Sequence, residues 1–180
     1  MTGASPIAAW EREPTDLRFT DDATGLPCAM IRHREMRTWC GYIGVLHTHP
    51  WHRLAYQTPV KAPSPLINRP VSIHELGAIN VFCAAASAKP EQGIWPIDVL
   101  VRCHGGITFS DVAYWENEDR ASWWFGFDCS HGGDYIPALA ANYGLANGVY
   151  RDAEYVQHCC AKAAADISLA AKAATRGAAA

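Results

Sequence analysis

The sequence lacks any hydrophobic run of about 20 residues, the length that an α-helix needs to cross a bilayer. Its first residues, MTGASPIAAWEREP, contain no basic segment followed by an apolar one, so no secretory signal is expected. Lysine and arginine form no block and the net charge is −3, so nothing indicates a DNA-binding surface. These absences predict a cytoplasmic protein that binds neither membranes nor DNA.

A CxxC pair is also missing, although the chain contains seven cysteines. The odd number, and the adjacency of Cys159 and Cys160, argue against a disulfide scaffold and against a zinc ribbon. We therefore expect most of these cysteines to be buried, reduced thiols.

What the chain does contain is enough apolar sequence for one globular domain. Hydrophobic residues make up 49% of the 180 residues and charged residues only 18%. Residues 1–27 are polar and without period, so they are expected to form an irregular N-terminal arm. Residues 28–177 are expected to form a single domain.

Short apolar runs and one long helical pattern predict an α+β fold with a mostly antiparallel sheet. Strands are expected at CAMIRH and WCGYIGVLH, and two central strands at IDVLVRC and WWFGFDC. Closely spaced prolines predict a loop over 53–70. A capping box at Ser72–Glu75 predicts a helical insertion near 71–88. The long C-terminal helix is expected to bury one stripe of side chains: Val156, Cys159, Cys160, Ala163, Ala164 and Ile167.

The stretch HTHPWH, residues 47–52, is the most conspicuous metal-binding pattern. It resembles the His-x-His-Pro core of the JAMM metalloproteases, but Gln57 and Val60 stand where that family has its Ser and its zinc-binding Asp. It also resembles the metallo-β-lactamase signature, with Trp51 in the place of the Asp. A catalytic zinc needs three protein ligands, so we predict no metal and no cofactor here. A structural zinc bound by His47, His49 and a cysteine is a weaker alternative.

Two similar motifs, CHGG and CSHGGD, follow the two expected central strands, and they could meet at one rim of the sheet. There His104 or His131 would be a general base, Asp128 or Asp134 would orient it, and Cys129 could be a nucleophile. Five further residues are expected to bind a ligand. The backbone amides of Gly105 and Gly106 could bind an anion, and the rings of Trp123 and Trp124 could stack on a flat ligand. Ser110 would contribute a hydroxyl group.

The joint pattern WCGYIGV…HP…CHGGITFS…WWFGFDCSHGGDYIP…YRDAEYV resembles a family of small, functionally uncharacterised proteins encoded in phage and prophage genomes. The resemblance covers about two thirds of the chain, from Cys40 to Val156. It implies a bacterial cytoplasmic setting and no particular activity.

Two functions remain open from the sequence. The first is a hydrolase or group-transfer enzyme that acts on a small or nucleotide-like ligand. The second is a non-catalytic phage protein that binds and inhibits a host enzyme or defence complex, with the many Trp and Tyr side chains as anchors. The oligomeric state is left open.

Overall fold

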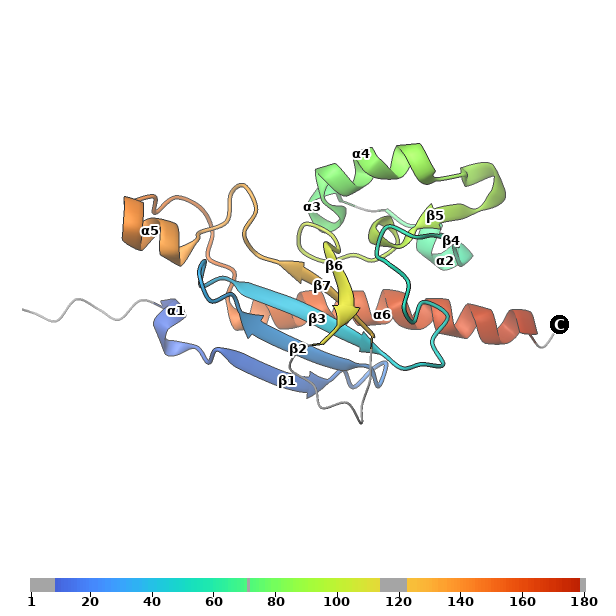
Figure 1. The fold of residues 1–180 in the computed structure, drawn as a ribbon, viewed down its shortest axis with the longest axis horizontal. Coiled ribbons are helices and arrows are strands. Elements are labelled where there is room, and N and C mark those ends of the chain that lie inside the picture. Colours follow the sequence, from blue (N-terminus) through green and yellow to red (C-terminus); the bar gives the residue numbers. More distant parts are fainter. Residues whose placement is uncertain (1–8, 71, 114–122, 179–180) are drawn as a thin grey trace, which may run out of the picture.

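The computed structural model describes residues 9–70, 72–113 and 123–178, and shows a single α+β domain. A five-stranded antiparallel sheet has the order β1–β2–β3–β7–β6, and helix α6 lies along one of its faces (Figure 1). The strands of this sheet are β1 (Asp16–Thr20), β2 (Pro27–Arg32), β3 (Trp39–Val45), β6 (Phe109–Val112) and β7 (Trp123–Asp128). The long helix α6 spans Ala153–Ala178, and a shorter helix, α5, spans Pro137–Tyr143.

The core lies between the sheet and α6, as the apolar stripe of the C-terminal helix predicts. All six stripe residues, from Val156 to Ile167, are buried. Gly41 of β3 allows close packing there, because a Cβ atom at this position would lie 2.4 Å from the ring of Phe127 and 2.9 Å from Cys160 Sγ. The expected β2–β3 hairpin and the expected strand β7 beside it are confirmed.

A helical segment, residues 64–99, is inserted between β3 and β6 (Figure 1). The expected helix over 71–88 is in fact two helices, because Gly77 adopts φ +79° and interrupts it. The capping box of Ser72 and Glu75 is confirmed. The elements of this segment, with the strand that precedes it, are β4 (Pro59–Lys61), α2 (Ser64–Ile67), α3 (Ile73–Leu76), α4 (Ala78–Ser87), η1 (Pro90–Gln92), β5 (Ile94–Pro96) and η2 (Ile97–Val99).

The prediction of a plain loop over 53–70 is therefore wrong in part. Its prolines leave room for β4, which pairs with β5 in a separate two-stranded sheet, and for α2, which has Pro65 in its first turn. Proline is tolerated in both places, since a two-stranded sheet has only edges and the first helical turn has unpaired N–H groups anyway.

The prediction of an irregular arm over 1–27 is also wrong for the residues that the structure describes. Helix α1 (Ala9–Arg12) leads into β1, which pairs along its whole length with β2 at the edge of the sheet. The alternation of Leu17 and Phe19 with polar residues is only five residues long, and its apolar side chains are half-buried. A short edge strand of this kind gives a weak signal in the sequence.

The stretch IDVLVRC is not a central strand. It forms the 3-10 helix η2 and an irregular connection, although most of its apolar residues are buried. Its backbone groups find partners other than a neighbouring strand: Leu100 O accepts from Arg69 Nη2 at 2.6 Å, and Arg102 N donates to Asp166 Oδ2 at 2.9 Å. Backbone carbonyls of other segments also take part, since Asp98 N donates to Tyr56 O at 2.9 Å and Cys103 N donates to Glu75 O at 3.0 Å. Because these partners meet the hydrogen-bonding needs of this backbone, a place in the main sheet is not required.

All seven cysteines are free thiols, and six of them are buried, as expected; Cys83 on α4 is exposed. None of the helices in the described part of the chain is both long and apolar enough to span a membrane.

Candidate functional site

The CHGG loop, residues 103–106, is held against the end of α3. Cys103 N donates to Glu75 O at 3.0 Å, and Gly105 N donates to His74 O at 2.8 Å. The two segments approach so closely that a Cβ atom at Gly77 would lie 2.1 Å from Gly105 O. The helical segment therefore fixes the position of the loop that carries His104.

The CSHGGD loop begins where β7 ends. Asp134 N donates to His131 O at 3.0 Å, and Asp134 forms an isolated bridge with Val149. Gly148 makes this bridge possible, because a Cβ atom there would lie 2.5 Å from the carbonyl group of Asp134. The chain just before α6 is thereby brought against the loop.

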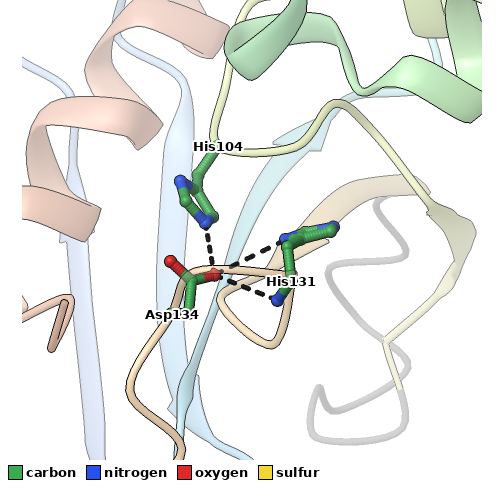
Figure 2. Close-up of side chains that lie close together, drawn as sticks. All are labelled: His104, His131 and Asp134. Carbon is green, nitrogen blue, oxygen red and sulfur yellow. Dashed lines mark hydrogen bonds and ion pairs between the residues drawn. The ribbon is translucent and has the colours of Figure 1, made fainter. Parts of the chain in front are cut away.

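Three side chains from these loops, His104, His131 and Asp134, form a compact group that we call the His–Asp cluster (Figure 2). His104 Nε2 lies 2.6 Å from Asp134 Oδ2, and the same oxygen accepts from the His131 backbone N–H at 3.0 Å. The two imidazole rings meet edge to face with centroids 5.2 Å apart. Gly105 leaves room for this contact, since a Cβ atom there would lie 2.2 Å from His131 Cε1.

Two residues near the start of α6 complete the hydrogen bonding of the cluster. Arg151 Nε donates to Asp134 Oδ1 at 2.9 Å, and Tyr155 OH lies 2.9 Å from His104 Nδ1. Because an ionised carboxylate only accepts, His104 Nε2 carries a proton; in the neutral imidazole, Nδ1 then accepts from the Tyr155 hydroxyl. Both nitrogens of His104 are thus occupied, and the ring is held in one orientation.

Asp134 stays ionised in this environment. Burial raises the pKa of its carboxyl, but hydrogen bonds from His104, Arg151 and the His131 amide outweigh burial and lower the pKa to about 2. His131 is held less completely: its side chain is 35% exposed, and its Nδ1 atom is buried with no hydrogen-bond partner, 3.8 Å from Asp134 Oδ2.

The cluster lies on the wall of a pocket of about 670 Å³. Residues of α3 and α4 also line the pocket, with Ile73 and Ile79 among them. Asp98 of η2 also lines the pocket; it is 2% exposed, and its Oδ1 atom has no hydrogen-bond partner. Burial raises the pKa of Asp98 to about 6.

The structure brings together only three of the five residues predicted to be catalytic. Asp128 does not join His104 and His131: it lines a different pocket, and its Oδ1 accepts from Ser130 N at 2.9 Å. The orienting carboxylate is Asp134 instead. Cys129 is 1% exposed, and burial, together with the charge of Asp134, raises the pKa of its thiol far above the ordinary value. Such a thiol is not an activated nucleophile.

The predicted ligand-binding residues are mostly engaged elsewhere. The Gly105 amide donates to His74 O, and the Gly106 amide to the sulfur of Cys103, so neither forms an anion nest. Ser110 Oγ accepts from Tyr56 N, Trp123 Nε1 donates to Leu54 O, and Trp124 is buried. Among the ten residues predicted for the site, those that line the pocket are His104, Gly105, His131 and Asp134.

The histidines of HTHPWH do not assemble a ligand set in the described structure. His49 is buried, its Nδ1 accepts from Trp51 N at 3.0 Å, and its Nε2 donates to Ile167 O at 3.1 Å. Both ring nitrogens are therefore engaged: Nδ1 within the loop itself, and Nε2 with α6. His47 is exposed and His52 is half-buried.

Sequence reasoning missed Asp98, Arg151 and Tyr155. Asp98 lies in the stretch wrongly expected to be a strand, and a buried acid in a short 3-10 helix has no distinctive pattern. Arg151 lies two residues before α6 and Tyr155 lies in its first turn, so no helical spacing relates the two. No local pattern could have indicated them.

Comparison of the chain with protein-family models, with curated proteins and with solved structures finds no match. The resemblance to phage-encoded proteins therefore stays a prediction. Function has to be inferred from the chemistry of the pocket, because a fold of this general class is compatible with many activities.

Proposed function

We propose that the protein is a small enzyme, a hydrolase or group-transfer catalyst, that acts on a small molecule bound in the His–Asp pocket. The observation that carries this proposal is the convergence of His104, His131 and Asp134 on one wall of a pocket of about 670 Å³. That volume is in the range of small-molecule sites, which combine apolar walls with a few fixed polar groups.

The two carboxylates of the pocket support different roles. Asp134 keeps its charge and orients His104, whereas Asp98, with a pKa of about 6, can both accept and give up a proton near neutral pH. Carboxylates whose environments drive their pKa values apart are typical of acid–base catalysis. We infer that Asp98 exchanges the proton and that the His–Asp cluster contacts the reacting group.

The substrate is inferred to have a polar reacting end and an apolar part. The polar end would face His131, the most exposed member of the cluster, while the apolar part would lie against Ile73 and Ile79. Stacking on Trp123 or Trp124 is not part of the proposal, because neither lines the pocket.

The proposal is tested with a small-molecule extract of bacterial cells, in which mass spectrometry follows the species that disappear. The wild-type protein should consume at least one species, and His131→Ala should slow its consumption by about 100-fold or more, the usual effect of losing an acid–base residue. His158→Ala, a change of an exposed histidine on α6, is the matched control and should behave as wild type.

Identical changes in the extract with wild-type protein and with His131→Ala would contradict catalysis at this site. They would favour the alternative, a binding protein without chemistry. One observation supports that alternative: on α4, Phe82 is 82% exposed and Ile79 is 77% exposed. Exposed apolar groups of this size are frequent in protein-binding surfaces.

A further inference from the structure

We propose that His104, His131 and Asp134 bind a divalent first-row transition metal ion of the Zn²⁺ type, with its open coordination positions facing the pocket. This inference rests on the proposed function, since it names the cofactor of the same pocket. It replaces the prediction of no metal, which was drawn from HTHPWH and concerned other histidines.

The donor set and its spacing fit such an ion. One ligand atom from each residue lies within 4.8 Å of the others. The nitrogen atoms that lie near Asp134 Oδ2 are His104 Nε2 and His131 Nδ1. Two ligands on one tetrahedral zinc lie about 3.3 Å apart, given metal–ligand distances of about 2.0–2.2 Å. The distances from Asp134 Oδ2, 2.6 Å to His104 and 3.8 Å to His131, lie on either side of that value. Small rotations of the two rings would equalise them.

An unpaired buried atom is the second, independent observation. His131 Nδ1 has no hydrogen-bond partner although it is buried, and it faces Asp134 Oδ2 (Figure 2). Buried polar atoms are nearly always paired, and an exception points to a missing partner such as an ion. A metal between the three ligand atoms would supply that partner.

The surrounding hydrogen bonds suit a metal site as well. Arg151 Nε occupies Asp134 Oδ1, whereas Oδ2 accepts from the His131 backbone N–H at 3.0 Å and keeps a second lone pair for the metal. When the metal takes His104 Nε2, the imidazole proton moves to Nδ1 and is donated to the Tyr155 oxygen, 2.9 Å away. The Tyr155 hydroxyl can then donate to the thiol of Cys159, with which it is hydrogen-bonded. Partners that fix the second atom of each ligand in this way are a regular feature of metal sites.

Three protein ligands and a position that opens onto a pocket describe a catalytic metal site rather than a structural one. A bound divalent ion would act as a Lewis acid and lower the pKa of a coordinated water. Asp98, which lines the same pocket and lies outside the ligand set, is then placed to exchange a proton with the substrate.

The test is a calorimetric titration. Zn²⁺ alone is added to protein that has first been treated with a chelator, and the heat of binding is measured. All proteins carry Cys83→Ser, because Cys83 is an exposed thiol that lines the same pocket and could itself bind zinc. We expect one equivalent to bind, His131→Ala to weaken binding by at least about 100-fold, and His158→Ala to leave it unchanged. His131→Ala keeps the His104–Asp134–Arg151 hydrogen bonds, so the fold should survive.

Co²⁺ in place of Zn²⁺ identifies the ligands by absorption. Nitrogen and oxygen ligands give d–d bands alone, whereas a cysteine ligand adds a thiolate-to-metal charge-transfer band. Absence of saturable binding, equal affinity in His131→Ala, or a thiolate band would each overturn the metal site. Turnover in the extract assay by chelated protein would overturn it while leaving the proposed function intact. Metal binding without turnover would leave the metal site standing and remove the proposed function.

Discussion

Asp134 and Asp98 show how the same residue type acquires opposite properties within one pocket. Asp134 accepts hydrogen bonds from His104, Arg151 and the His131 amide, and these hold its pKa at about 2. Asp98 is hydrogen-bonded only by backbone amides, and burial raises its pKa to about 6. A buried carboxyl that destabilises the folded protein is frequently a functional residue, since selection for stability alone would replace it.

Asp98→Asn should stabilise the protein in a pH-dependent way. The folded-state pKa lies above the unfolded value of 3.8, so folding favours the protonated form. The wild type therefore loses stability as the pH rises from about 4 to about 6, while the variant does not. At pH 7 the gain in the free energy of unfolding should be roughly 3 kcal/mol, which is the difference between the two pKa values converted to energy.

Urea unfolding of both proteins at pH 4 and at pH 7 measures this gain. The gain in the free energy of unfolding from Asp98→Asn should be present at pH 7 and nearly vanish at pH 4. The control Asp22→Asn, a change at an exposed residue, should have little effect at either pH. Equal stability of wild type and Asp98→Asn at pH 7 would show that Asp98 is not buried as described.

At the scale of elements, the segment that precedes β1 joins the sheet to the start of α6. The Glu13 carboxylate accepts from Trp39 Nε1 at 2.9 Å, from Ala153 N at 3.0 Å and from Arg32 Nη2 at 2.9 Å. Ala153 is the first residue of α6, so Glu13 satisfies one of its free N–H groups and places a negative charge at the positive end of the helix.

Removal of residues 1–20 should therefore destabilise the protein, although the sequence pattern predicts a dispensable arm. The deletion removes β1 and leaves the indole N–H of Trp39 buried without its acceptor, which alone costs about 1–3 kcal/mol. Arg32 would lose its ion pair with Glu13 as well. Thermal unfolding should show a melting temperature lower by several degrees or more.

Glu13→Gln provides the matched control for this deletion. Its amide oxygen can still accept from Trp39 or from Ala153, but not from both, and the charge that faces Arg32 is lost. Because β1 remains in place, the effect of this change should still be smaller than that of the deletion. If the protein without residues 1–20 has the same melting temperature as the full-length protein, the assignment of β1 and Glu13 to the folded core is wrong.

At the scale of the whole molecule, Asp166 connects three separate parts of the chain. This α6 residue is fully buried and pairs with Arg69, which follows α2, and with Arg102, which precedes His104. Arg69 in turn donates to Leu100 O in the connection after η2. The long helix, the helical segment and the loop that carries the site are thus held by one carboxylate.

Asp166→Ala should both destabilise the fold and disturb the site. It leaves Arg69 buried without a counter-charge, and breaking a buried ion pair in this way costs about 3–5 kcal/mol. For a chain of this size the melting temperature should fall by roughly 6 to 20 °C. Because Arg102 is two residues from His104, Zn²⁺ binding should weaken at temperatures where the variant is still folded.

Asp22→Ala, a change at an exposed residue, is the control. The melting temperature and the Zn²⁺ affinity of this variant should both match those of the wild type. Loss of stability in Asp166→Ala with full Zn²⁺ affinity would separate the buried ion pair from the position of His104.

The sequence by itself determined the features that depend on local pattern. The β2–β3 hairpin, the strand β7, the capping box before α3 and the buried stripe of α6 all follow from periodicity or from hydrogen bonds between residues near one another in the chain. It also indicated His104, His131 and Asp134, together with residues that do not join them, because clusters of polar residues beside glycine turns tend to form sites.

The tertiary structure decided which of those residues meet. Asp128 and Asp134 are equally plausible partners for a histidine in the sequence, yet β7 directs Asp128 toward another pocket, while the turn after it brings Asp134 to His104. Asp98 and Tyr155 reach the site through packing that no local pattern records. Tyr155, for example, is 51 residues from His104 along the chain. The alternation of IDVLVRC was misleading for the same reason, because Asp166 and Arg69 satisfy its backbone from distant elements. Local pattern fixes which side chains are buried, but pairing between distant segments depends on the packing of the whole chain.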